Sequence, residues 1–206
     1  MKNPKKILLV PALLALSFTA GTAPAGAEEL EESPGWPPED TGGKYVPVHP
    51  GFYDTFEVRA CGTTVEIISG AVREVEEKIS VRRDGSTVIR YRGGSTVDLK
   101  RSDGAFVDEL DVSGAGIDRI SPDLRNVSTT VRGASIIFPQ SAPDAAALAE
   151  AGFPEFFVFE KGRLTFELTF SDANLDLPTT VEITQNSARK VTDLCKLLDE
   201  APKVAS

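Results

Sequence analysis

Few residues of this 206-residue chain could do covalent chemistry, and their spacing narrows what they could do. The chain has two cysteines, Cys61 and Cys195, and one histidine, His49, which lies in a proline-rich stretch. A cysteine or serine nucleophile needs a base beside it, and a structural zinc ion needs four ligands. Two distant cysteines and one histidine meet these needs poorly, so we expect a disulfide between Cys61 and Cys195 rather than two free thiols, a catalytic thiol or a zinc site.

The remaining motifs are weaker. Asp172, Asn174 and Asp176 have the spacing that opens a calcium-binding loop. The EF-hand pattern then requires glycine and, at its twelfth position, glutamate, where this chain has Leu177 and Ile183. A polar loop is therefore the better interpretation, and with no nucleotide-binding motif in the sequence we expect no metal and no cofactor.

Carboxylates and phenylalanines leave two hypotheses open. The chain has 31 acidic residues, and a glycosidase-type carboxylate pair has no fixed sequence spacing, so a carboxylate-based hydrolase stays an alternative. Five phenylalanines near the C-terminus could line an apolar cavity or form ordinary core: Phe156, Phe157, Phe159, Phe166 and Phe170.

The N-terminus indicates export. Lysines at 2, 5 and 6 precede an apolar run from Ile7 to Leu16, and Ala25–Ala27 forms a signal-peptidase site, so 1–27 is predicted to be a cleaved signal peptide rather than an uncleaved anchor. Cleavage leaves 19 basic and 31 acidic residues, a net charge of −12. Such acidity disfavours nucleic acid and anionic membranes as partners, and we expect no stable membrane insertion after cleavage.

The mature chain is predicted to be a single β-rich domain, 51–200. An acidic, Pro/Gly-rich flexible arm, 28–50, precedes it, and a disordered tail, 201–206, follows it. Turn signals predict three hairpins, around Asp84-Gly85, Asp103-Gly104 and Lys161-Gly162. In a two-residue turn the first hairpin sets Val81 opposite Val88, and the second sets Val97 opposite Leu110.

The rest of the chain completes a mainly β pattern. Strands are expected at 53–60, 62–69, 126–138 and 179–184, a loop at 113–125, and helices at 141–152 and 187–199. Successive hairpins predict an antiparallel meander that forms a barrel-like sheet or a sandwich, with one short internal helix and a C-terminal helix.

Two cysteine-containing segments carry a resemblance. Arg59–Val65 and Asn186–Cys195, with Tyr91–Gly93 between them, resemble secreted proteins of actinobacteria for which no activity is established. The similarity covers about 52–200 and implies export and a bridged domain, without a function or a site residue.

These observations favour a non-enzymatic extracellular protein. The first hypothesis is that it binds a small apolar ligand, and the second is that it is a protein–protein interaction module on or near the cell surface. The carboxylate-based hydrolase is the third. A cavity, an exposed apolar patch or a carboxylate pair in a cleft would distinguish the three.

Overall fold

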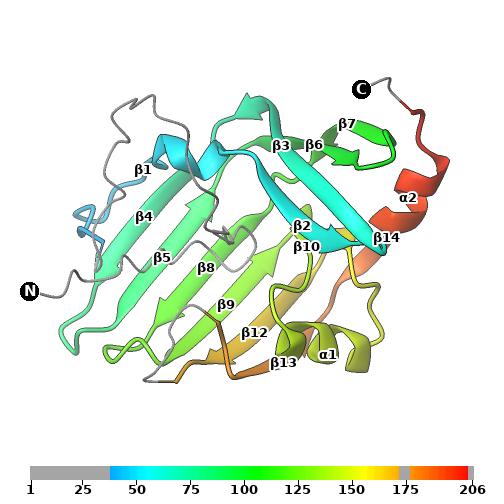
Figure 1. Cartoon of the computed structure of the whole chain (residues 1–206). Coiled ribbons are helices and arrows are strands. Elements are labelled where there is room, and N and C mark those ends of the chain that lie inside the picture. Colours follow the sequence, from blue (N-terminus) through cyan, green and yellow to red (C-terminus); the bar gives the residue numbers. More distant parts are fainter. Residues whose placement is uncertain (1–37, 172–176, 204–206) are drawn as a thin grey trace, which may run out of the picture.

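The computed structural model describes residues 38–171 and 177–203. The predicted signal peptide (1–27), the first part of the predicted arm (28–37) and the calcium-loop residues Asp172, Asn174 and Asp176 lie outside the described residues. The mainly β fold class is confirmed (Figure 1), with every strand pair antiparallel.

A seven-stranded sheet is the largest layer, in the order β1-β4-β5-β8-β9-β12-β13. Its strands are β1 (Val46–Pro47), β4 (Glu76–Val81), β5 (Thr87–Arg92), β8 (Ala115–Ile120), β9 (Asn126–Arg132), β12 (Arg163–Thr169) and β13 (Thr180–Asn186). Because facing residues of antiparallel strands point to the same side, Ile89, Asp118 and Thr129 share one face. We call it the inner face.

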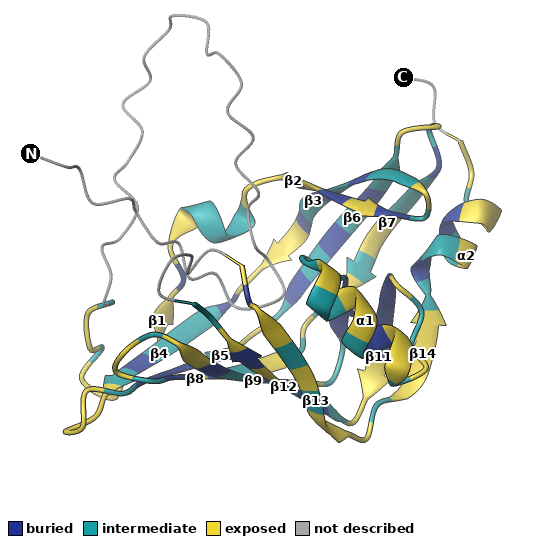
Figure 2. Ribbon diagram, turned by 60° about the horizontal axis from the view of Figure 1, so that its bottom comes forward, coloured by how far each residue is buried: buried dark blue, intermediate teal, exposed yellow. Residues whose placement is uncertain are grey.

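Two smaller sheets complete the architecture. One contains β2 (Phe56–Ala60), β3 (Thr63–Arg73), β6 (Ser95–Arg101) and β7 (Phe106–Asp111), and the other contains β10 (Ser135–Ile137), β11 (Phe157–Lys161) and β14 (Arg189–Asp193). The helices are η1 (Pro50–Tyr53), α1 (Ala142–Glu150) and α2 (Leu194–Glu200). Within the described residues the sheets do not close into a barrel; their arrangement is sandwich-like, with the large sheet as one wall (Figure 2).

The first Asp-Gly hairpin has a different register from the one predicted. Val81 pairs with Thr87 rather than with Val88. The Gly85 amide donates to the Arg82 carbonyl at 3.0 Å, and Gly85 has φ +82°. This is the three-residue loop in which a turn is followed by a left-handed glycine, and it shifts the pairing by one residue.

The second hairpin has the predicted pair, Val97 opposite Leu110, for a reason that the turn alone does not supply. Nearer the turn, Leu99 pairs with Val107, which is the register of a three-residue loop. A bulge then adds one residue, and Glu109 in this bulge has φ +49°. The extra residue restores the predicted pairing farther along the strands.

The third predicted hairpin is wrong. β11 and β12 flank Gly162, yet β11 pairs with β10 and β14, whereas β12 pairs with β9 and β13. The chain changes sheets at Gly162, which has φ +100°, and a Cβ there would lie 1.9 Å from the Ser187 carbonyl oxygen. Strict alternation along β12 shows that one face is buried but does not identify its partner strands.

The predicted loop 113–125 contains strand β8 and is also corrected. Gly114 and Gly116 suggested a loop, but each allows close approach inside the structure. A Cβ on Gly114 would lie 2.2 Å from Ser135 Oγ, and one on Gly116 would lie 3.3 Å from Cδ2 of the Tyr91 ring. These glycines therefore let β8 lie against its neighbours.

The C-terminal helix begins later than predicted. Residues 189–193 form β14, and α2 starts only after Asp193. The Asp193 carboxylate accepts hydrogen bonds from the backbone amides of Cys195 (3.0 Å) and Lys196 (3.2 Å), which makes Asp193 the N-cap. The β-branched residues Val191 and Thr192 before it favour a strand. The internal helix is confirmed, with Ser141 as its N-cap.

The described parts of the predicted arm and tail contact the folded domain. The Asp40 carboxylate accepts a hydrogen bond from the Val81 amide at 2.8 Å, and the Arg92 guanidinium lies 3.8 Å from the centre of the Tyr45 ring. At the other end, the Pro202 carbonyl accepts from the Phe106 amide at 3.1 Å. Backbone pairing and a cation–π contact hold segments whose composition alone favours disorder.

Candidate functional site

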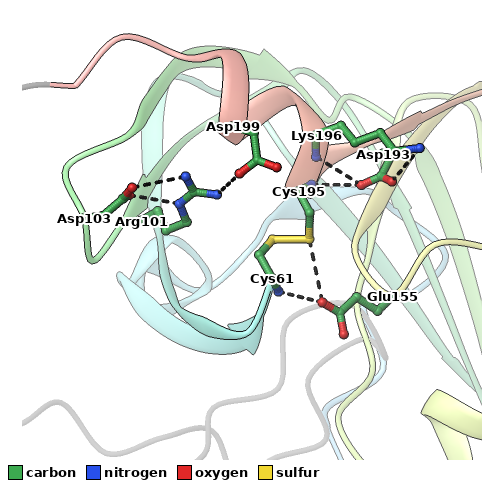
Figure 3. Close-up of a disulfide and its surroundings, with 8 residues drawn as sticks. All are labelled: Cys61, Arg101, Asp103, Glu155, Asp193, Cys195, Lys196 and Asp199. Atoms are coloured by element: carbon green, nitrogen blue, oxygen red, sulfur yellow. Dashed lines mark hydrogen bonds and ion pairs between the residues drawn. A yellow bond between two sulfur atoms is a disulfide. The ribbon is translucent and has the colours of Figure 1, made fainter.

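The predicted disulfide joins Cys61 to Cys195 (Figure 3), with 5.2 Å between their Cα atoms. It ties the β2–β3 turn, where Cys61 has φ +57°, to the first turn of α2 across a separation of 134 residues. Neither cysteine is free. A thiolate nucleophile or ligand at these positions is therefore excluded while the bridge is intact.

Glu155 lies directly beside this bridge (Figure 3). Its Oε1 accepts a hydrogen bond from the Cys61 amide at 2.6 Å and lies 3.7 Å from the sulfur of Cys195. Two cysteines and a carboxylate within a few ångströms look like a metal site, but both sulfurs are already bonded to each other. We therefore interpret the arrangement as structural support for the turn that contains Cys61.

A cluster of ion pairs ties the second hairpin to α2. The Arg101 guanidinium donates to Asp103 at 2.9 Å and to Asp199 at 2.6 Å, and Lys203 donates to Asp103 at 2.8 Å (Figure 3 shows the first two pairs). Hydrogen bonds from Arg101 and then Lys203 hold the pKa of Asp103 well below its usual range. The Arg101 side chain is only 12% exposed, whereas its carboxylate partners and Lys203 are exposed. The pairs explain how α2 and the tail are positioned rather than any chemistry.

A second acidic cluster contains Asp98, Asp108 and Glu109 on β6 and β7. Glu109 accepts hydrogen bonds from the Ala71 amide (2.7 Å) and the Thr96 hydroxyl, while its own amide donates to Asp98 at 2.8 Å. The bond from Ala71 joins the β7 bulge to an irregularity in β3, and the other two bonds join the bulge to β6. The cluster thus has a structural explanation.

The five predicted phenylalanines do not form the cavity. Phe156, Phe157 and Phe159 are completely buried in the packed core, and Phe166 and Phe170 pack beside the apolar residues of the inner face. None of them lines the pocket described next. Successive residues of β11 point to opposite faces, so this run supplies two different core clusters instead of one cavity wall.

A pocket of about 100 Å³ lies between the inner face of the large sheet and the four-stranded sheet. Residues of η1 close one side of it. Its apolar wall includes Phe52, Tyr53, Phe56, Ile67, Val97 and Val131. Phe52 is stacked on Tyr91 with 6.3 Å between ring centres and contacts Tyr53 edge to face at 5.3 Å. The volume is enough for several water molecules or a small organic group.

Asp118 introduces the one charge into this wall. Among the described residues that line the pocket it is the one with a charged side chain, and it is only 4% exposed. The Thr129 hydroxyl donates to its carboxylate at 2.8 Å. Burial raises the pKa of Asp118 to about 6, and the hydrogen bond from Thr129 partly opposes that rise.

Tyr91 lies within the electrostatic influence of Asp118 and of a second carboxyl group, Glu77. Burial raises the pKa of Tyr91 well above its ordinary value, and the charges of Asp118 and then Glu77 raise it further. Tyr53 differs, since its hydroxyl accepts a hydrogen bond from the Val75 amide at 2.9 Å. The pocket therefore combines aromatic rings with a negative electrostatic potential.

We expect the variant Thr129→Val to raise the pKa of Asp118 above its value of about 6. The substitution keeps the side-chain shape but removes the hydroxyl that favours the ionised carboxylate. NMR titration of the Asp118 carboxyl carbon measures this change. Thr130→Val serves as control, because its hydroxyl bonds to Thr165; a lowered or unchanged pKa in Thr129→Val would contradict the assignment.

No family model, curated protein or solved structure matches the chain. In 38–171 and 177–203, no helix is long and apolar enough to cross a membrane. Asp118 was not among the predicted site residues, because 113–125 was expected to be a loop. In strand β8, Asp118 lies two residues before the buried Ile120, so both side chains point to the same buried face. A carboxyl group at such an inward position is the feature that would have indicated a candidate site.

Proposed function

We propose that this protein is exported and binds a small, largely apolar molecule in the pocket between its two larger sheets. The observation that carries the proposal is the wall itself, in which aromatic and aliphatic side chains from both sheets and η1 surround one buried carboxyl group. Ligand pockets commonly combine an apolar wall with a few polar groups that fix orientation. The disulfide and the signal-like N-terminus support export.

The binding hypothesis fits the pocket better than the hydrolase hypothesis. Carboxylate-based glycoside cleavage needs two carboxyl groups on opposite sides of the reacting bond. Among the described residues that line the pocket, Asp118 is the one carboxylate. A single buried carboxyl group in an apolar wall is suited to orienting a ligand rather than to paired acid–base chemistry.

The first experiment is native mass spectrometry of the full-length gene product recovered from culture medium. We expect the mass of 28–206 less two hydrogens, together with a non-covalent adduct that is lost on denaturation. Retention of 1–27 would overturn export. Without an adduct, titration with the neutral fluorescent probe N-phenyl-1-naphthylamine tests the empty pocket.

We expect the variant Ser69→Leu to weaken binding of N-phenyl-1-naphthylamine at least tenfold. Ser69 lines the pocket on β3, so the larger side chain should fill part of its volume. Ser80→Leu is the matched control, because Ser80 alternates with the inward-facing Ile79 and therefore lies on the other face of the large sheet. Equal affinity in both folded variants would contradict binding at this pocket.

A further inference from the structure

The Asp118 carboxylate lacks the partners that an ionised buried group needs. A carboxylate has about four acceptor positions, and a buried charge is stable only when it is paired or well hydrogen-bonded. Among the described residues, the Thr129 hydroxyl is the one group that donates a hydrogen bond to Asp118. The side chain is nonetheless 4% exposed and lines the pocket, so a group inside the pocket is placed to complete its coordination.

The described protein supplies no cation to this carboxylate. The pocket wall contains no lysine, arginine or histidine in its described part. Arg73, on the neighbouring β3, donates to the carbonyl groups of Ser69 (2.8 Å) and Gly70 (2.9 Å), so its guanidinium is already engaged. When Asp118 is ionised, a balancing positive charge would therefore have to come from a ligand.

The surroundings of Asp118 also favour a cation over an anion. Phe52 and Tyr91 present aromatic rings to the pocket, and ring faces attract cations while their edges pack against apolar groups. The Tyr53 ring also lines the pocket, but the Arg73 guanidinium already lies 6.0 Å from its centre. The carboxyl groups of Asp118 and Glu77 both contribute negative charge at Tyr91. An anionic head such as a fatty-acid carboxylate would be repelled by the same groups.

We infer that the ligand is an apolar amine whose protonated nitrogen donates to the Asp118 carboxylate while its apolar body lies among the aromatic side chains. This inference rests on the proposed function, because it assigns the head group of the molecule that occupies the same pocket. Thr129 is a positioning residue, because its hydroxyl donates the hydrogen bond that orients the Asp118 carboxylate.

Three probes of similar size test the head group: 2-phenylethylamine, 2-phenylethanol and 3-phenylpropanoate. Each is titrated at pH 7.5 against the disulfide-bonded protein carrying N-phenyl-1-naphthylamine, and displacement of the fluorophore is measured. We expect the amine to displace it at a concentration at least tenfold lower than the alcohol, and the carboxylate to be weakest. In Asp118→Asn the preference for the amine should be lost while binding of the alcohol is retained.

The outcomes separate the head group from the pocket. Equal displacement by the amine and the alcohol, or a preference for the amine that persists in Asp118→Asn, would overturn the amine assignment and leave the pocket intact. Displacement by none of the three, while N-phenyl-1-naphthylamine still binds, would also overturn it. Failure of the fluorophore itself to bind to the ligand-free protein would overturn the proposed function.

Discussion

Asp118→Asn should be more stable than the wild type at neutral pH. Its advantage in free energy of unfolding should be up to about 3 kcal/mol larger at neutral pH than at pH 4. Burial raises the pKa of Asp118 from 3.8 to about 6 in the folded protein. Each unit of such a shift corresponds to about 1.4 kcal/mol. Between pH 4 and 6 the folded state binds more protons than the unfolded state, so this carboxyl group makes stability fall as the pH rises. Asparagine removes the charge and keeps an acceptor for Thr129.

Urea unfolding of the wild type and Asp118→Asn at pH 4, 5, 6 and 7 measures this effect. The gap between the two proteins should widen through this window and level off above pH 6. Asp84→Asn is the control: hydrogen bonds from Ser86 lower the pKa of Asp84, so its removal should not produce such a widening gain. A gap for Asp118→Asn that stays constant from pH 4 to 7 would show that the carboxylate is solvated.

A stabilising substitution at the pocket has a functional meaning. Proteins tolerate destabilising groups where ligand binding requires them, so loss of activity with gain of stability marks a working site. In the same variant we expect loss of amine preference and gain of stability. The loss of amine preference is the result that marks a binding role, because the gain in stability follows from burial of the Asp118 charge alone.

Local patterns in the sequence predicted most of the strands but not their partners. The alternation along β12 and the Asp-Gly turns depend on neighbouring residues, which the sequence shows directly. The change of sheet at Gly162 depends on contact with Ser187, 25 residues later, and no local signal reports it. The Val97–Leu110 pair was predicted from a turn that the structure does not have and is restored by the bulge at Glu109.

The candidate site was less predictable than the fold. The disulfide followed from a count of two cysteines, whereas Asp118 is one of 31 acidic residues and stands out only when its strand and its face are known. The glycines at 114 and 116 hid β8, although their lack of side chains is what allows the close approach beside the pocket. The phenylalanine run gave the wrong wall because core packing and cavity lining use the same residue types.

Replacing both Cys61 and Cys195 with serine should lower the free energy of unfolding by about 2–5 kcal/mol. A bridge across 134 residues removes much of the conformational entropy of the unfolded chain, about 5 kcal/mol in the chain-entropy model. The seven-residue helix α2 would then depend on burial of Leu194 and Leu198 and on the Arg101–Asp199 pair. Urea unfolding with and without a reductant measures the loss in the wild type, and the double variant should not respond to reductant.

Asp199→Ala is the matched control for the bridge, because it removes an ion pair that connects α2 to the second hairpin, whereas the bridge connects α2 to the β2–β3 turn. Its side chain is 67% exposed, so we expect the loss to stay below about 1 kcal/mol. A double serine variant within 1 kcal/mol of the wild type would mean that packing alone holds α2. The larger expected loss would instead place the bridge among the main determinants of stability. The buried carboxyl group of Asp118 has the opposite effect, because its charge destabilises the folded protein at neutral pH.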